Sequence, residues 1–231
     1  MRLERACGNP RILSLAVGLA LALVLGAPAW AGTLKVVQIF FEFNSTDNDL
    51  GVQVFLDAGA WRVLTITDPD GNTILQLEAH GSLGQLGLTE YFFESDEPSP
   101  EEVLALFQGG KYGFELTTVD GQTLRGQATL SHDLPEPVVI LSPEEDGSVD
   151  PGDAVITWIH PNPNTLAGIQ VIVENVTSEV QVAAFSLPAS ATVVQVPSQA
   201  FAGPGMKYKV EVLAISKNGN KTIVEVPFTV Q

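Results

Sequence analysis

The residues of this sequence that could do chemistry lie in one short polar stretch. Asparagine and aspartate are crowded together there, between two strand-like runs. Closely spaced oxygen ligands on a loop are what Ca²⁺ needs, and a negatively charged chain attracts such a cation. The stretch therefore predicts a calcium site with Asn44, Asp47, Asn48 and Asp49 as candidate ligands, and Asp57, after the next strand-like run, as another. Glu42, just before the stretch, is a further candidate ligand.

The same polar residues have an ordinary structural interpretation. Asn and Asp are common in turns because their side chains hydrogen-bond to nearby backbone. The stretch also differs from the Asp-x-Asp-x-Asp-Gly calcium loop that is followed by a distant Glu. A plain turn between two strands therefore stays open as the alternative to a calcium site.

Other chemically useful residues are scattered. The three histidines, His80, His132 and His160, lie at least 28 residues apart, whereas a zinc site normally places two ligands close together on one element. The sequence contains no Gly-x-Ser-x-Gly elbow, no phosphate-binding glycine loop and no His-Glu-x-x-His helix. Nothing marks two of its many carboxylates as a hydrolytic pair. We therefore expect no enzymatic activity and no cofactor other than Ca²⁺.

Aromatic side chains could instead form a platform for sugar rings. Trp61, Tyr91 and Phe92 are the candidates, and the last two are neighbours in a strand-like run, so they point to opposite faces. The alternative is that all three belong to the hydrophobic core. Carbohydrate binding stays open beside Ca²⁺ binding.

The first thirty-one residues have the three-part pattern of a secretory signal peptide. Arg2, Arg5 and Arg11 form a basic region, and the mostly apolar run at 12–25 is shorter than the about 20 residues of a membrane-spanning helix. Ala-Trp-Ala at residues 29–31 then offers a cleavage site. We expect a secreted protein, periplasmic or extracellular, with no stable membrane span after signal cleavage.

The charge of the chain limits its partners. Cleavage after residue 31 would remove three arginines and one glutamate, leaving 200 residues with 8 basic and 26 acidic side chains and a net charge of −18. Such a field repels nucleic acid and anionic membrane surfaces. The only cysteine, Cys7, would also be removed, so no disulfide stabilises the exported chain. We expect a protein or polysaccharide partner in the envelope or outside the cell, and no nucleic acid.

The exported length suits two domains of about 100 residues each. Residues 32–134 predict an N-terminal β-rich domain, with a turn at 57–60 between two strands and a loop at 81–87. Ser99 and Glu102 form a capping box around Pro100, which predicts one short helix. Two prolines in residues 132–137 predict a stiff connector to the second domain.

Residues 135–231 predict a β-sandwich. Seven short strand-like runs follow one another with turn residues between them and no helix signal. Trp158 in an early strand and Tyr208 at the start of the alternating run 207–216 are predicted structural residues, with Tyr208 as a corner residue bonded through its hydroxyl. The expected fold class is all-β, with two β-sandwich-like domains and one short helix in the first.

Over residues 137–230 the chain resembles a fibronectin type III domain. The residues that carry the resemblance are Val155-x-Thr157-Trp158, Gly168-Ile169-Gln170-Val171 and Gly203-Pro204-Gly205-x-x-Tyr208 with the alternation through Ala214. The chain has Ile169 where an aromatic is common and contains no Arg-Gly-Asp tripeptide. The resemblance therefore implies the immunoglobulin-like fold and a spacer or docking role, but not integrin-type adhesion.

The N-terminal half is similar to a group of uncharacterised exported bacterial proteins that place such a β domain before a type III domain. This similarity rests on Glu42-x-Asn44-x-Thr46-Asp47-x-Asp49-x-Gly51, on Phe93-Glu94-Ser95-x-Glu97-Pro98 and on the junction Leu130–Pro135. It implies an architecture and a bacterial origin, with no activity attached.

These observations lead to one main functional hypothesis. The protein is expected to be a non-enzymatic exported binding, interaction or structural protein of the cell envelope or extracellular space. The alternative is a Ca²⁺- or carbohydrate-binding β-domain protein, and a hydrolase is a third possibility.

Overall fold

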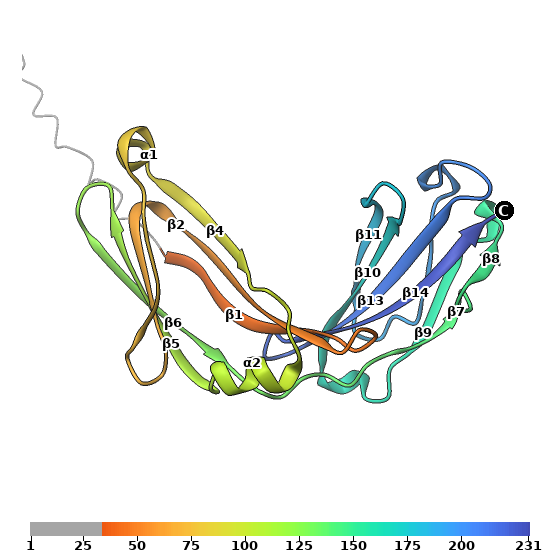
Figure 1. Ribbon diagram of the computed structural model, residues 1–231, viewed down its shortest axis with the longest axis horizontal. Helices are drawn as coiled ribbons and strands as arrows, with labels where there is room; N and C mark the ends of the chain where they lie inside the picture. The colour runs from red at the N-terminus through yellow and green to blue at the C-terminus, as the bar shows by residue number, and fades with distance from the viewer. Residues whose placement is uncertain (1–33) are drawn as a thin grey trace, which may run out of the picture. The chain divides into compact units, whose positions relative to one another are not determined.

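A computed structural model describes residues 34–231, and the predicted signal peptide at residues 1–31 lies outside them (Figure 1). The described part is an all-β protein of sandwich-type layers, whose two α-helices have only six and seven residues. The fold class expected from the sequence is confirmed. Among the described residues, no helix has the length and apolar composition that crossing a membrane requires.

The first half of the fold contains six strands and both α-helices. Their bounds are β1 Leu34–Asn44, β2 Asp49–Thr67, β3 Thr73–Glu78, α1 Gly81–Leu86, β4 Leu88–Glu94, α2 Pro100–Leu106, β5 Gly110–Thr118 and β6 Thr123–Leu130. The predicted capping box is present at α2, because the Glu102 carboxylate accepts hydrogen bonds from the backbone N–H and the hydroxyl of Ser99, at 3.2 and 2.7 Å. The predicted loop at 81–87 instead contains α1, which has no buried residue.

Strand β2 builds both layers of this half. Residues 49–58 of β2 pair with β1 and residues 53–57 with β4, whose Leu88 also pairs with Trp61. Residues 61–67 pair with β5 and residues 63–67 with β3. The turn predicted at residues 57–60 is therefore wrong, and these small residues lie within one 19-residue strand. Register shifts on either side of Trp61 let the strand pass from one layer to the other.

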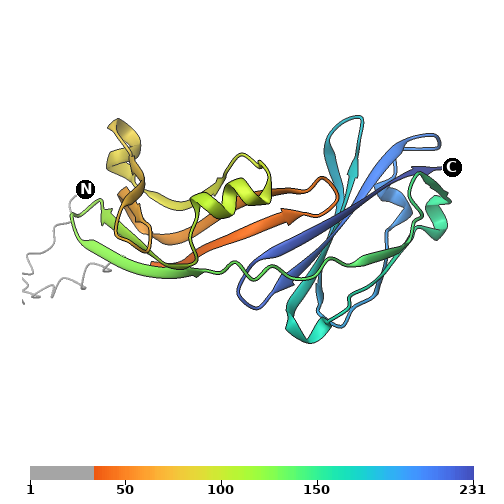
Figure 2. The same cartoon turned by 60° about the horizontal axis from the view of Figure 1, so that its bottom comes forward.

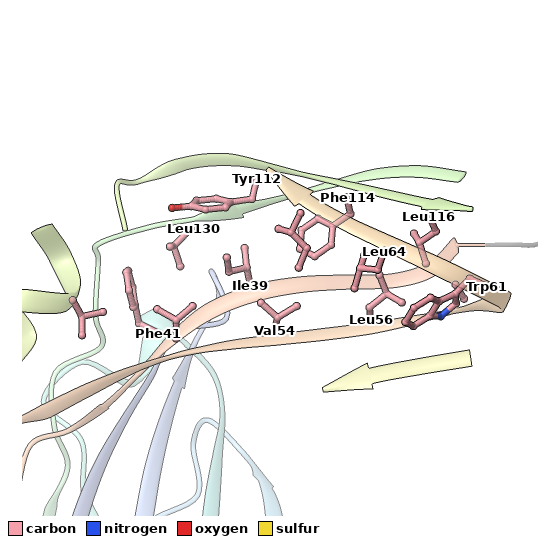
Figure 3. Close-up of a cluster of buried hydrophobic side chains, with 14 of the residues drawn as sticks. Ile39, Phe41, Val54, Leu56, Trp61, Leu64, Tyr112, Phe114, Leu116 and Leu130 are labelled. Atoms are coloured by element: carbon pink, nitrogen blue, oxygen red, sulfur yellow. The ribbon is translucent and has the colours of Figure 1, made fainter. Parts of the chain in front are cut away.

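The hydrophobic core of the first half lies between these two layers. Side chains from β1 and the first part of β2 point toward side chains of β5, as Figure 3 shows for Ile39, Val54 and Phe114. The indole of Trp61 is fully buried in this cluster. It belongs to the core, as alternation along a half-buried strand requires.

The second half of the fold is a two-layer sandwich of eight strands. Its bounds are β7 Val139–Ser142, β8 Gly147–Val149, β9 Val155–Ile159, β10 Leu166–Asn175, β11 Val180–Pro188, β12 Val193–Gln195, β13 Lys207–Ser216 and β14 Lys221–Val230, with 3₁₀ turns at Pro151–Asp153, Pro163–Thr165 and Ser198–Ala200. One layer has the order β12-β9-β7 and the other β11-β10-β13-β14, and β8 pairs in parallel with the end of β14. This is the immunoglobulin-like arrangement of a fibronectin type III domain. The sequence predicted seven strands here, and β8 is an eighth.

Trp158 and Tyr208 lie in the core of this sandwich, exposed by 1% and 0%. The Tyr208 hydroxyl accepts a hydrogen bond of 2.8 Å from the backbone N–H of Ala202, six residues upstream. The phenol ring also stacks on Phe228, with 5.8 Å between the ring centroids. The tyrosine thus fixes the segment that leads into β13 against the end of β14.

The two halves share one hydrogen-bonded sheet. Strand β1 pairs in parallel with the start of β14, where Glu42 lies opposite Lys221 and Asn44 opposite Ile223, and Figure 2 shows the orange β1 beside the dark blue β14. Each half nevertheless has a hydrophobic cluster of its own. The division into two separate domains near residue 134 stays a prediction.

Candidate functional site

Three glutamates meet at the end of the β1–β2–β4 sheet. Glu42, Glu94 and Glu97 each place a carboxylate oxygen within 4.8 Å of the other two. Glu42 comes from β1, Glu94 ends β4, and Glu97 lies in the segment that leads into α2. We call these three residues the glutamate cluster.

Strand pairing explains why the cluster forms. Gln53 of β2 lies opposite Glu94, and its amide nitrogen donates hydrogen bonds to Glu42 Oε1 at 2.8 Å and to Glu94 Oε1 at 2.9 Å. Gly51, opposite Glu42, leaves room for the third carboxylate, because a Cβ at this position would lie 2.9 Å from Glu97 Oε1. The cluster therefore forms because the Gln53 amide bonds two of the carboxylates and because Gly51 has no side chain to exclude the third.

A hydrogen-bonded segment positions Glu97. The backbone N–H of Leu50 donates to the carbonyl of Pro98 at 3.0 Å, and the N–H of Val52 donates to the Ser95 hydroxyl at 2.9 Å. The segment between β4 and α2 is thus fixed to the start of β2. Glu97 is held over the sheet at the cost of electrostatic repulsion from its neighbours.

Burial and the repulsion between these carboxylates raise the pKa of two of the acidic groups here, Glu97 and Asp49. Partial burial, followed by the charges of Asp49, Glu94 and Glu42, raises the pKa of Glu97 above its ordinary value. Burial and then the charge of Asp47 raise the pKa of Asp49, whose Oδ1 is buried without a hydrogen-bond partner. The Lys221 ammonium already offsets part of the negative charge of the cluster, since its Nζ donates a hydrogen bond to Glu42 Oε2 at 2.7 Å. Further positive charge would relieve the repulsion that remains.

The structure brings only part of the predicted calcium ligands to this place. Asp49 is close enough to raise the pKa of Glu97, and Glu42 belongs to the cluster. Asp57 lies six residues beyond Gly51 along β2, about 20 Å away at the rise of a strand, and forms an ion pair of 3.0 Å with Lys35. The structure therefore separates Asp57 from the other acidic residues.

Asn44 and Asp47 have turn-forming roles. The Asn44 side-chain oxygen accepts hydrogen bonds from the backbone N–H groups of Thr46 and Asp47, at 3.0 and 3.4 Å. The Asn44 amide donates to Asp47 and to Glu225 of β14, both at 3.2 Å. In this geometry the Asn44 oxygen caps the β1–β2 turn, which is the alternative that the sequence left open.

Sequence reasoning did not assign Glu94 and Glu97 to a site. They lie more than forty residues after the polar turn, and only the pairing of β2 with β4 brings them to it. The signal within the sequence was the closely spaced Glu94-Ser95-Asp96-Glu97 run just before the capping box.

The remaining candidates for chemistry lie apart from one another. Of the three aromatic residues that could bind a sugar ring, Trp61 lies in the hydrophobic core and Tyr91 is half-buried. Phe92 is the one that is exposed, at 58%. His132 Nε2 donates to the Phe107 carbonyl at 2.7 Å, and His160 Nε2 donates to the Glu136 carbonyl at 2.8 Å. The side chains of these two histidines therefore stabilise the backbone of neighbouring loops by hydrogen bonding.

A second polar centre holds the connector between the halves. Asn220, exposed by 1%, accepts a hydrogen bond of 2.9 Å from the Phe41 N–H and donates to the carbonyls of Ser131 and Asp133 at 2.8 and 2.9 Å. The buried Thr222 hydroxyl donates to the Pro135 carbonyl at 2.7 Å. The predicted stiff connector is thus bonded to β14, and Asn220 bonds β1 and the connector together.

Comparison with known proteins yields distant structural likenesses. No family model matches this chain, and no curated protein matches it. Three similar solved structures are the FN1–FN3 domains of chicken CNTN1 (8% identity, TM-score 0.38), the BSP domain of a biofilm associated protein (15%, 0.28) and a tetra-tandem repeat in the extending region of a large adhesion protein (12%, 0.29).

The extent of these likenesses is limited. They cover 86%, 86% and 85% of this chain but only 64%, 29% and 50% of the three structures, so the chain spans less than two thirds of each. At these identities and TM-scores they assign no role to the site.

Proposed function

We propose that this protein is a non-enzymatic exported interaction protein that acts at the cell envelope or outside the cell. The observation that carries the proposal is the buried junction, in which Asn220 and Thr222 join β1, the connector and β14. Burying an asparagine with three hydrogen-bond partners is useful for fixing one backbone arrangement, not for chemistry. A fixed arrangement of two β cores suits a protein that presents surfaces to a partner.

The junction also offers a surface to such a partner. A hollow of about 510 Å³ is lined by residues of both halves, among them Phe40 of β1 and Lys217 and Lys221 near the β13–β14 turn. Lys221 lies 4.8 Å above the Phe40 ring, with its ammonium also bonded to Glu42, so the hollow places two lysines beside apolar surface in an otherwise acidic chain. A protein or polysaccharide bound there would contact both halves at once.

Saturable binding to an envelope fraction tests this proposal. The exported chain, residues 32–231, is expected to bind the fraction with a defined affinity, and Lys217→Glu at the hollow is expected to weaken binding at least tenfold. Lys111→Glu, an equal charge change on β5, is the control. Protease treatment of the fraction should abolish binding to a protein partner and leave binding to a polysaccharide. Absence of saturable binding would refute the proposal.

The glutamate cluster supports a second candidate function, the binding of Ca²⁺. Carboxylate oxygens are ligands that Ca²⁺ prefers, and here three lie within 4.8 Å of one another beside the unpartnered Asp49 Oδ1. A bound ion would join β1, β4 and the segment before α2. This role rests on Glu42, Glu94, Glu97 and Asp49, and not on the remote Asp57.

Thermal unfolding tests the calcium role. We expect millimolar Ca²⁺ to raise the melting temperature relative to chelator, because an ion that binds only the folded state stabilises it. Glu97→Gln should remove this rise, while Asp57→Asn, in the ion pair with Lys35, should keep it. Equal melting temperatures with Ca²⁺ and with chelator would exclude the role.

A further inference from the structure

The outer face of the β12-β9-β7 layer is unusually apolar. A sheet with one face in water normally alternates apolar and polar side chains, whereas strands covered on both faces are apolar throughout. In β9, Ile156 and Trp158 point into the core, and the outward residues Val155 and Ile159 are aliphatic as well. Strands β7 (Val-Ile-Leu-Ser) and β12 (Val-Val-Gln) show the same lack of alternation. The layer thus has the composition of a layer that is covered on both faces.

The other layer of this sandwich shows the ordinary alternation. Val210 and Val212 of β13 are buried in the core, and the outward Lys209 and Glu211 between them form an ion pair of 2.9 Å. Glu225 of β14 pairs with the same ammonium at 3.1 Å. An apolar outer face is therefore a property of the β12-β9-β7 layer and not of the whole sandwich.

Strand pairing gathers the outward side chains into one patch. Val139 lies opposite Ile159 and Val193 lies opposite Thr157, and opposite residues of antiparallel strands share a face; Figure 1 shows β7 beside β9. Leu141 follows at the register shift of β7. We call Val139, Leu141, Ile159 and Val193 the apolar patch. Each is 50–54% exposed, and contiguous apolar surface of this kind marks interaction sites.

A hollow adjoins one end of the apolar patch. It has a volume of about 470 Å³ and lies between the segment after β9 and the segment before β12. Its apolar lining comes from Ile159, Pro163, Ala189 and Ala191. His160, also in the lining, is bonded through Nε2 to the Glu136 carbonyl at 2.8 Å, which holds one wall in place. The hollow has room for an apolar side chain of a partner that lies on the patch.

Carboxylates gather at the opposite end of the layer. The end of β7 and the start of β9 meet there, because the two strands are antiparallel. Five exposed acidic residues flank these strand ends, namely Glu144, Glu145, Asp146, Asp150 and Asp153. The chain has no Lys or Arg from residue 126 to residue 206, so no basic side chain of this long segment offsets their charge. This end of the layer therefore attracts positive charge.

We propose that the apolar patch binds a partner protein through a segment that has apolar side chains and a basic end. One apolar side chain enters the hollow, and Lys or Arg lies at the five carboxylates, because charge complementarity selects the partner and fixes its direction. Aliphatic side chains offer no aromatic face to a sugar ring, which favours a protein over a polysaccharide. A second copy of this acidic chain and an anionic membrane are both disfavoured by repulsion. The inference rests on the proposed interaction function and adds a surface to it.

Selection from a random peptide library displayed on phage tests the chemistry of the partner. The library is selected on residues 32–231 and counter-selected on Val139→Lys. We expect the peptides that require Val139 to be rich in Lys and Arg together with Leu, Ile or Phe, and poor in Asp and Glu. Val180→Lys on β11 is the matched control, because it makes the same change at a valine that is 53% exposed outside the layer. Absence of Val139-dependent peptides, or Val139-dependent peptides without basic residues, would overturn the proposal.

Fluorescence anisotropy with one selected peptide measures each contribution. Val139→Lys should raise the dissociation constant at least tenfold, and Glu144→Gln with Glu145→Gln at least threefold. Added salt should also weaken binding, because it screens the charges. Val180→Lys and Lys217→Glu should change the dissociation constant less than twofold. Circular dichroism melting checks that each variant is folded, and Val193→Lys replaces Val139→Lys if the latter is not. Binding that is insensitive to the carboxylates and to salt would contradict the proposed basic end.

Three further results would also overturn the proposal. A dimer in sedimentation velocity that Val139→Lys abolishes would assign the patch to a second copy. Binding to phosphatidylcholine vesicles that Val139→Lys abolishes would assign it to a lipid surface. Envelope binding that Lys217→Glu weakens and Val139→Lys leaves unchanged would reject the patch while the proposed function stands.

Discussion

The buried amide of Asn220 should contribute more to stability than any other polar side chain at the junction. Replacing Asn220 with alanine leaves the fully buried Phe41 N–H without an acceptor and the Ser131 carbonyl without its donor. The Asp133 carbonyl keeps the Asn218 amide, which donates to it at 2.9 Å. An unsatisfied buried group costs about 1–3 kcal/mol, so we expect about 2 kcal/mol from the N–H and about 1 kcal/mol from the partly exposed carbonyl.

Urea unfolding of residues 32–231 measures this loss. At a slope of about 2 kcal/mol per molar urea, a loss of about 3 kcal/mol lowers the midpoint by about 1.5 M. Each half has one buried tryptophan, Trp61 or Trp158. Replacing one of them with phenylalanine, which keeps a buried ring, leaves a fluorescent reporter in the other half, and Asn220→Ala is compared with Asn220 within each such background. If the junction couples the halves, both reporters should share one transition in the parent chain and separate after Asn220→Ala.

Two further variants distinguish hydrogen bonding from packing. Asn220→Asp keeps the volume and the acceptor for Phe41, but it loses both donors and places a carboxylate beside two carbonyls, so it should destabilise at least as much as alanine. Asn164→Ala, an exposed asparagine whose side chain makes no hydrogen bond in the described part of the chain, should change stability by less than about 0.5 kcal/mol. A midpoint shift below about 0.5 M for Asn220→Ala would refute the reasoning.

Three further predictions concern the core and the glutamate cluster. Tyr208→Phe should cost about 1 kcal/mol for its hydroxyl bond and Trp158→Ala about 3–5 kcal/mol for its buried ring, and equal small losses in urea unfolding would contradict the assigned roles. Because the pKa of Glu97 is raised in the folded state, its contribution to stability is present below about pH 4.5 and is lost as the pH rises through the raised pKa. In chelator, Glu97→Gln should therefore melt higher than the parent chain at pH 8 and equally at pH 4; a lower melting point at pH 8 would contradict this sign. Gly51→Ala should displace the Glu97 carboxylate and abolish any rise in melting temperature with Ca²⁺, without unfolding the chain as judged by circular dichroism.

Local features of the fold were predictable because neighbouring residues decide them. Period-2 alternation in Lys207–Ser216 marked a strand with Tyr208 on its buried face. The capping box at Ser99 marked the start of α2, since its two partners are three residues apart. The same rules failed at residues 57–60, where a Gly flanked by alanines reads as a turn. Asp57 before this Gly and Trp61 after it both have partners in two neighbouring strands, and this pairing carries the strand through a weak local preference for a turn.

The sequence by itself determined the all-β class, seven of the eight strands of the second sandwich, its buried Trp158 and Tyr208, and the acidic character of the turn after β1. Only the tertiary structure decided which of these segments meet. Phe41 and Asn220 are 179 residues apart, and Glu42 reaches Glu94 only because β2 pairs with β1 on one side and β4 on the other. Strand pairing depends on backbone groups that every residue carries, so no local pattern of side chains specifies the partner.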